Sequence, residues 1–124
     1  MIAADSSSLI AHFAGDRGPD TDLLARAFLD SDLALPPVVL TELLTDPRVP
    51  AQMENELANL LTLDLHEGYW VRAGHSRRLL RQRGLKAKLA DSLIAQACID
   101  HDVALITRDR DFRHFAEHCG LRLA

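Results

Sequence analysis

The pattern of hydrophobic and polar residues predicts a chain in which short strands alternate with helices. Short apolar runs bounded by turn-forming residues are typical of strands, and they occur at residues 1–5, 33–36, 60–65 and 103–107. Between these runs, apolar residues recur three or four positions apart, which is the period of a helix with one buried face. The predicted helices cover residues 6–14, 21–30, 38–46, 51–60, 67–83 and 88–100, with a last helix marked by Phe112, Phe115 and Cys119 and an edge strand at 121–123.

Strands that alternate with helices favour a parallel sheet, because each helix carries the chain back to the start of the next strand. The predicted fold class is therefore α/β, a three-layer α/β/α arrangement around a short-stranded, mainly parallel central sheet. The sequence contains no internal repeat, linker or low-complexity stretch, and 124 residues suffice for one hydrophobic core. We expect a single domain that spans residues 1–124.

Several residues predict where the helices begin and end. The serines at positions 6–8 are candidate caps for the first helix, and Pro37 suits a first helical turn. Gly84 is expected to end the helix before it, and Asp111 is expected to cap the last helix. The helix at 88–100 is expected to bury one apolar stripe, made of Leu89, Ala90, Leu93, Ile94, Ala97 and Cys98.

Composition and charge place the chain among ordinary globular proteins. Hydrophobic residues make up 48% and charged residues 26%, no apolar run has the length of a membrane span, and the start of the chain lacks the basic residues of a secretory signal. Cys98 and Cys119 lie in apolar helical patterns, so we expect reduced core residues and a cytoplasmic location. The net charge of −4 argues against a general nucleic-acid coat protein, although residues 75–88 are strongly basic and contain no acid.

Four acidic residues lie where this fold would bring them to one edge of the sheet. They are Asp5, Glu42, Asp91 and Asp109. Ligand sites in parallel sheets form beyond the carboxyl ends of the strands. Asp5 ends the first strand, and Asp109 lies just past the last one. Glu42 is near the start of the helix that leaves the second strand, and Asp91 is in the first turn of the helix that leads into the last strand. All four are therefore expected at the same edge.

A group of carboxylates of this kind requires neutralisation. Two carboxylates about 4 Å apart repel by roughly 4 kcal/mol at an effective dielectric constant near 20. Mg²⁺ and Mn²⁺ prefer oxygen ligands and keep bound waters, as an open acidic cleft allows. Taken singly, Asp91 suits a helix dipole, Asp5 a strand end and Asp109 a turn. Glu42 is harder to explain alone, because two valines one turn earlier in its helix would remove its hydration.

The motifs around these acids resemble those of a known family. DSSSLI (5–10), LTELL (40–44), ADSLIAQAC (90–98) and ITRDRDF (106–112) are similar, in order and approximate spacing, to the acidic motifs of PIN-domain ribonucleases. The resemblance covers essentially the whole chain, and the size and the short first strand look most like the VapC toxins of prokaryotic toxin–antitoxin systems. The sequence departs from the family after Glu42, where prolines follow quickly in place of a longer helix. This departure affects the expected shape of the substrate groove.

The resemblance implies an endoribonuclease that depends on Mg²⁺ or Mn²⁺. Asp5 and Asp91 would be the most direct metal ligands. Glu42 and Asp109 would complete the shell, bind a second ion or orient the attacking water. Whether one or two ions bind is left open.

The resemblance also implies residues and molecules that act around the four acids. Ser6 and Thr107 match small hydroxyl positions that support the ligands. Asp111 is the alternative fourth acid, in a supporting position. The expected partners are an RNA substrate, a cognate VapB-like antitoxin and a second copy of the chain in a homodimer, with no membrane. The sequence does not name the RNA.

Other residues have candidate roles outside the acidic site. Candidate RNA contacts are Arg77, Arg78, Arg81, Lys86, Lys88 and Arg108, with a solvated helix face as the equal alternative. His114 and His118 share a helix face but lack a third ligand, so a surface pair is expected in place of a zinc site. Tyr69 and Trp70 suit a core or dimer-interface role better than base stacking.

Two other functions fit a small α/β chain with acids at its strand ends. A receiver-like phosphoacceptor domain would need a second acid beside Asp5 and a lysine after the last strand, and the sequence has neither. A catalytically silent PIN-like module that binds RNA or protein is opposed by the intact set of acids. The nuclease is the favoured interpretation.

Overall fold

The computed structural model describes residues 1–124 and contains a four-stranded, entirely parallel sheet. The strands are β1 (Ile2–Ala4), β2 (Leu33–Leu35), β3 (Leu61–Thr62) and β4 (Ala104–Ile106), in the order β3-β2-β1-β4. β1 lies in the middle and pairs Ile2 with Leu33 on one side and with Ala104 on the other. The segment predicted as an edge strand meets β4 in a single parallel bridge between Leu105 and Leu123.

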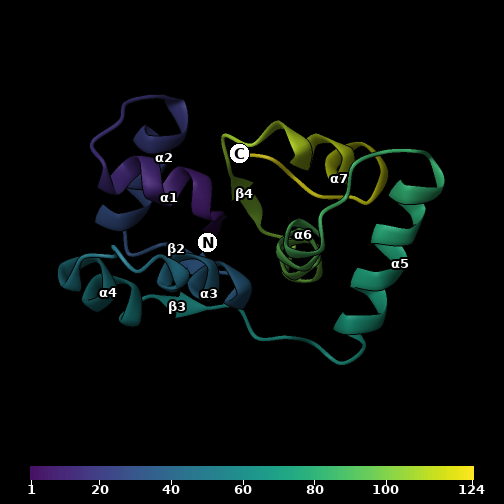
Figure 1. Cartoon of the computed structure of the whole chain (residues 1–124), viewed down its shortest axis with the longest axis horizontal. Helices are drawn as coiled ribbons and strands as arrows, with labels where there is room; N and C mark the ends of the chain where they lie inside the picture. The colour runs from purple at the N-terminus through teal and green to yellow at the C-terminus, as the bar shows by residue number, and fades with distance from the viewer.

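The helices cover both sides of this sheet, as the sequence predicted. They are α1 (Ser6–Phe13), α2 (Pro19–Leu29), α3 (Pro37–Thr45), α4 (Ala51–Ala58), α5 (Tyr69–Gln82), α6 (Leu89–His101) and α7 (Arg113–His118), with a 3₁₀ turn η1 (Arg110–Phe112) before α7. Figure 1 shows α1 and α2 on one side of β4, and α5, α6 and α7 on the other. The three-layer α/β/α class is confirmed.

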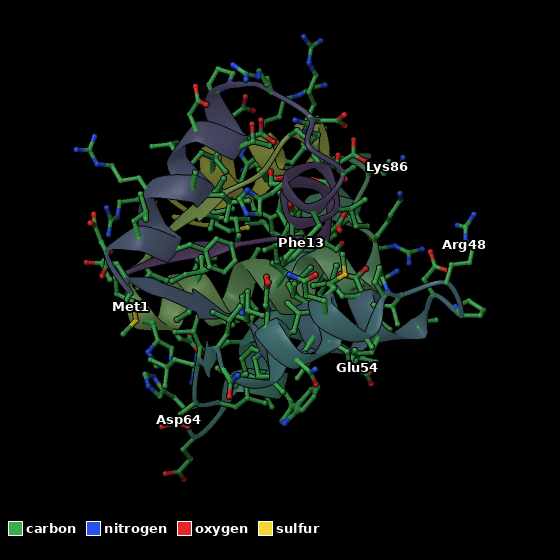
Figure 2. All side chains as sticks on the ribbon, turned by 90° about the vertical axis from the view of Figure 1, so that its left-hand side faces the viewer. Met1, Phe13, Arg48, Glu54, Asp64 and Lys86 are labelled. Carbon is green, nitrogen blue, oxygen red and sulfur yellow. The ribbon has the colours of Figure 1, made fainter.

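Small side chains in the central strands let the helices approach the sheet closely. Ala3, Ala4 and Ala34 are fully buried, and they belong to a core of 25 buried hydrophobic residues. Phe112 and Phe115 are fully buried as well and pin the end of the chain to this core. Charged side chains such as Arg48, Glu54 and Asp64 point outward (Figure 2). None of the helices combines the length and the apolar character that a membrane span requires.

Helix α6 is buried almost all round, so the single apolar stripe predicted for it was wrong. Leu89, assigned to that stripe, is 61% exposed, whereas Ser92 and Gln96 are buried. The helix lies against α3, α5 and β4, which leaves little of its circumference in solvent. The buried side chain of Gln96 has partners: it accepts a hydrogen bond from Ser76 (2.7 Å) and donates one to Asp100 (2.9 Å).

Two of the predicted helix caps are also wrong. Asp5 itself caps α1, because its Oδ1 accepts the backbone N–H of Ser8 at 3.3 Å, so the serines are not the cap. Asp111 does not cap the last helix, because the N-cap position of α7 is Phe112 and has no side-chain cap; Asp109 instead caps the preceding η1 turn by accepting the N–H of Asp111 at 2.9 Å. In both cases the capping carboxylate is the residue that directly follows or nearly follows a strand. Each turn is therefore tied to the edge of the sheet.

The remaining side-chain predictions have mixed outcomes. Both cysteines are free thiols, and Cys98 is fully buried. Tyr69 is buried and its hydroxyl donates to the Leu93 carbonyl at 2.6 Å, whereas Trp70 is 64% exposed. The predicted surface pair formed by His114 and His118 is half-buried, because α7 packs against α5.

Candidate metal centre

The carboxyl edge of the sheet gathers carboxylates from four separate segments. Asp91, Asp109 and Asp111 each offer an oxygen atom, and these atoms lie within 4.8 Å of one another. Asp5 and Glu42 border this group. These two residues and the group interact through their charges. In addition to burial, the charge of Asp109 raises the pKa of Asp5, and the charge of Glu42 raises the pKa of Asp91. Residues separated by most of the chain therefore share one acidic site.

Asp5 is buried and fully hydrogen-bonded. It follows β1 directly, and its side chain accepts the hydroxyls of Ser7 at 2.8 Å and Thr107 at 2.7 Å, together with the Ser8 N–H. Burial raises the pKa of Asp5, these three hydrogen bonds counteract the rise, and the charge of Asp109 adds to it. The donors fix the orientation of the carboxylate and stabilise its ionised form.

Asp91 is buried to a similar degree but lacks such donors. It lies in the first turn of α6 with 8% of its surface exposed, and its Oδ2 atom has no hydrogen-bond partner. Burial raises the pKa of Asp91 to about 6, with further contributions from the charges of Asp109 and Glu42 and an opposing one from Lys88. A buried carboxylate oxygen without a partner is costly, and a divalent cation would satisfy it. The donor set, made only of carboxylates, suits Mg²⁺ or Mn²⁺.

Glu42 is exposed, which corrects the burial expected from the two valines before it. Val39 is buried and Val38 half-buried, but the side chain of Glu42 leaves the apolar face of α3. Its Oε1 accepts the Ser6 hydroxyl at 3.2 Å. The pKa of Glu42 is still raised, first by partial loss of hydration at the cleft wall and then by the charge of Asp5. Its position at the mouth leaves one side of the carboxylate open to solvent.

Asp109 and Asp111 both belong to the acidic group, so the structure keeps both candidates for the fourth acid. Asp109 donates its backbone N–H to the Thr107 hydroxyl at 3.0 Å while its side chain caps η1. Asp111 forms an ion pair with Lys86 at 3.1 Å, and hydrogen bonding from Lys86 lowers the pKa of Asp111. Lys86 is thus a cation that already stands beside the acids.

Three of the basic residues proposed as RNA contacts, Arg77, Lys86 and Arg108, have partners within the protein. A hollow of about 460 Å³ on α5 is lined by Gly74, Arg77, Arg78, Arg81, Gln82 and Leu89. Arg77 also donates to the Ala87 carbonyl at 2.9 Å, which holds the loop before α6. Arg108 donates two hydrogen bonds to Asp20.

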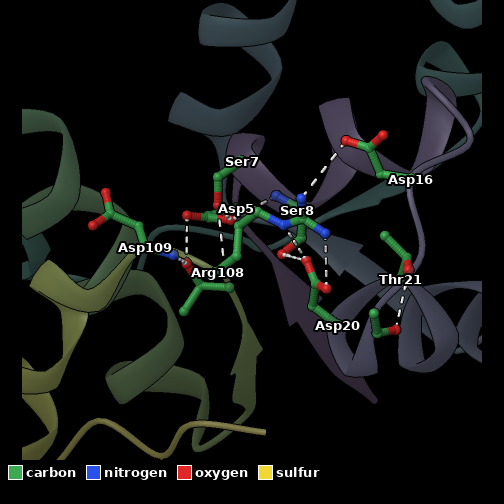
Figure 3. A network of polar contacts seen from close by, with 10 residues as sticks. Asp5, Ser7, Ser8, Asp16, Asp20, Thr21, Arg108 and Asp109 are labelled. Atoms are coloured by element: carbon green, nitrogen blue, oxygen red, sulfur yellow. Dashed lines mark hydrogen bonds and ion pairs between the residues drawn. The ribbon is translucent and has the colours of Figure 1, made fainter.

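Sequence reasoning did not predict how the residues around Asp5 contact one another. Ser7, Ser8, Asp20 and Arg108 form a continuous polar network beside it (Figure 3). The run of three serines after Asp5 was a usable signal for Ser7, since consecutive hydroxyls beside a strand-end carboxylate can donate to it. Asp20 gave none, because it lies in a loop-like GDRGPD stretch with no pattern that points to residue 108.

Comparisons with known proteins agree with this geometry. A family model described as PIN domain matches residues 2–118. A comparison with curated proteins finds no match.

Several solved structures have similar folds. VapBC2 from Rickettsia felis, bound to a DNA fragment from its promoter, is similar with a TM-score of 0.69 and 24% identity, over 100% of this chain and 98% of that one. DNA-bound VapBC from Salmonella typhimurium gives 0.70 and 18% over 100% and 98%. FitAcB from Neisseria gonorrhoeae gives 0.67 and 19% over 99% and 96%. At these identities the likeness establishes the fold.

Proposed function

Because the chain belongs to the PIN domain family, we propose that it is an endoribonuclease whose carboxylates hold Mg²⁺ or Mn²⁺. Membership of this family supports a hydrolase of nucleic acids. The observation that carries the finer proposal is the unpartnered, buried Oδ2 of Asp91, which lies in a group of three carboxylates. Such an oxygen requires a cation or a proton, and a bound cation is what a nuclease of this family would need for catalysis.

In this proposal Asp5, Asp91 and Asp109 hold the ion, and Glu42 completes the site. When bound, the ion would supply Lewis-acid stabilisation of phosphate charge and a lowered pKa for a coordinated water. The protein supplies orientation: Ser7 and Thr107 hold the plane of the Asp5 carboxylate.

Glu42 has the features of a proton acceptor. The Ser6 hydroxyl occupies Oε1, which leaves Oε2 at the open mouth of the site to take a proton from the attacking water. The raised pKa of Glu42 makes its carboxylate more basic than an ordinary one.

The RNA backbone would approach across the basic residues that flank the acids. The hollow on α5 contains Arg77, Arg78 and Arg81, and the loop from α5 to α6 adds Lys86 and Lys88. Guanidinium groups bind phosphates with two hydrogen bonds each, whereas contacts of this type carry no base specificity. We therefore assign substrate orientation, and not sequence choice, to this surface.

The proposal extends to a toxin neutralised by a VapB-like antitoxin in the cytoplasm, with the toxin as a homodimer. It is supported by the fold shared with chains of VapBC and FitAcB assemblies. An inserted guanidinium from the partner would be a suitable plug for clustered carboxylates. Co-expression with the neighbouring open reading frame should relieve growth inhibition, and a lack of rescue would reject the toxin role while leaving the nuclease role intact.

The test of the nuclease is cleavage of total RNA with Mg²⁺ or Mn²⁺. Wild type, Asp5→Ala and Asp91→Ala are compared, with Asp64→Ala as the matched control because Asp64 is an exposed aspartate outside the acidic group. We expect cleavage by wild type and the control only, and its loss with EDTA. Equal cleavage by all four proteins would reject the proposal. RNA binding that persists in EDTA without cleavage would favour the silent module. Mapping the cleaved ends would identify the target RNA.

A further inference from the structure

We propose that Asp20 is a positioning residue of the metal centre, which acts through Arg108 to hold together the two segments that carry Asp5 and Asp109. The inference rests on the proposed function in one respect, namely that the acidic group binds a metal ion. Asp20 belongs to α2 and does not hydrogen-bond to any of the acids at the sheet edge. Its influence has to pass through the residues that contact it.

The ion pair between Arg108 and Asp20 has the geometry of a strong, orienting interaction. Arg108 Nε donates to Asp20 Oδ2 at 2.7 Å, and Nη2 donates to Oδ1 at 3.0 Å. Two parallel hydrogen bonds fix the relative orientation of both groups, which a single contact does not. Only 11% of the Asp20 side chain is exposed. The guanidinium holds the pKa of Asp20 at about 2, so the carboxylate stays ionised over the whole working range.

Asp20 connects two segments at once. Its Oδ2 also accepts the Ser8 hydroxyl at 2.9 Å, which fixes the first turn of α1 beside Asp5. Arg108 lies between Thr107, which donates to Asp5, and Asp109, which belongs to the acidic group. The Arg108 backbone N–H further donates to the Ser7 hydroxyl at 3.4 Å. Figure 3 shows Arg108 extending from the β4 end to Asp20 across the start of α1.

The ion pair leaves no room for a side chain at Gly18. A Cβ atom at Gly18 would lie 2.9 Å from Asp20 Oδ1 and 3.7 Å from Arg108 Nη2. A methyl group there would have to displace the carboxylate. Gly18→Ala therefore offers a way to shift the ion pair while both of its charges remain in the protein.

The competing role for Arg108 is a direct contact with RNA phosphate. That role predicts that freeing Arg108 from Asp20 would strengthen substrate binding and lower KM. The positioning role predicts a weaker metal site and a lower kcat at unchanged KM. A fall in KM would therefore support the RNA contact, whereas a fall in kcat and in metal affinity at unchanged KM would support the positioning role.

The experiment compares Asp20→Asn with Asp100→Asn. Asp100 is a close match: it accepts two hydrogen bonds from Arg72, at 3.0 and 2.7 Å, and one from Gln96, but it lies at the α5–α6 contact away from the acids. Mn²⁺ affinity is measured by calorimetry, and kcat and KM by RNA cleavage. Mutation of a residue that orients a metal ligand lowers metal affinity or activity by about 10–100-fold. We expect Asp20→Asn to lose about 10-fold in both Mn²⁺ affinity and kcat, and Asp100→Asn to keep wild-type values.

Two further variants keep the inference testable if Asp20→Asn does not fold. Arg108→Lys keeps the positive charge but loses the paired hydrogen bonds, and Gly18→Ala displaces Asp20. Both should weaken Mn²⁺ binding, and excess Mn²⁺ should restore their kcat. Wild-type Mn²⁺ affinity in Asp20→Asn or in both of these variants, or a lower KM in Asp20→Asn, would overturn the inference. If wild type binds Mn²⁺ but cleaves no RNA, the proposed nuclease fails while the affinities still decide the role of Asp20.

Discussion

Asp5 and Asp91 are two buried carboxylates at the same site with opposite surroundings. Asp5 is 3% exposed and receives three hydrogen bonds, two from hydroxyls and one from a backbone amide. Asp91 is 8% exposed, has an oxygen without a partner and has a pKa raised to about 6. Burial is nearly the same in both cases. What differs is whether the protein itself replaces the lost hydration.

The comparison separates two tasks of a metal site. The Asp5 side is held in one orientation whether or not an ion is present, because hydroxyl and amide donors surround it, although burial still raises the pKa of Asp5. The Asp91 side is completed only by something from outside the chain. A preorganised ligand such as Asp5 lowers the entropic cost of metal binding. An unpartnered ligand such as Asp91 makes metal binding favourable, because the ion satisfies its buried oxygen. The following predictions test each half.

The largest effect is expected from neutralising either carboxylate. Asp5→Asn and Asp91→Asn should each lower RNA cleavage by more than about 100-fold, which corresponds to about 2.7 kcal/mol in activation free energy. Their metal-free stabilities should move in opposite directions. Asp91→Asn removes a repelled charge and should raise the free energy of unfolding, whereas Asp5→Asn leaves donors without a carboxylate and should lower it. Denaturant titration with EDTA measures both. A shift of the same sign would mean that the two sides do not differ.

The pH dependence of metal-free stability should follow Asp91. Its pKa is about 6 in the folded protein against 3.8 for an ordinary aspartate, so the folded state binds the proton more tightly. Stability should therefore fall as the pH rises from about 4 to about 6, by up to about 2 kcal/mol. The loss is complete about one pH unit above the folded pKa, near pH 7. Thermal unfolding in EDTA at pH 5 and pH 7.5 checks the sign, and Asp91→Asn should lose most of the difference.

The hydroxyl of Thr107 is expected to matter less than the carboxylates. Thr107→Val removes the 2.7 Å donor to Asp5 and the acceptor for the Asp109 N–H. Cleavage and Mn²⁺ affinity should each fall by about 10-fold, as for other groups that orient metal ligands. Thr107→Ser keeps the hydroxyl and serves as the control. If Thr107→Val and Thr107→Ser have the same activity and Mn²⁺ affinity, the hydroxyl does not support Asp5.

Lys86 should give the smallest effect. It pairs with Asp111 but is exposed, and exposed ion pairs are weak. Lys86→Gln should raise Mn²⁺ affinity by about twofold, because a competing cation is removed from the acidic group. Calorimetry at low ionic strength, where screening is least, is the measurement. A fall in affinity would instead make Lys86 a necessary part of the site.

The sequence predicted the meeting of distant acids because parallel topology sends every strand end to one edge. Asp5, Asp91 and Asp109 could be assigned to it from their positions next to strands or at a helix start. Glu42 was assigned to the right segment but given the wrong burial, because exposure depends on what packs against α3. The caps at Asp5 and Asp109 were missed because a site residue was not expected to serve a second purpose.

Contacts between side chains far apart in the sequence could not be predicted in this way. Arg108 and Asp20 are 88 positions apart, and each lies in a segment without periodicity. The burial of α6 on all sides was hidden for a related reason. Ser92 and Gln96 lie outside the predicted apolar stripe, but both are buried, and α5 supplies the hydrogen bond from Ser76 to Gln96.

The enclosure of α6 by α3, α5 and β4 has a consequence for how the molecule opens. Amide hydrogens in such a segment exchange with solvent only through unfolding of the whole cooperative unit. Deuterium uptake should therefore be slowest along residues 92–98. The first turn of this helix carries Asp91, so the backbone that positions this carboxylate would be among the last parts of the molecule to unfold.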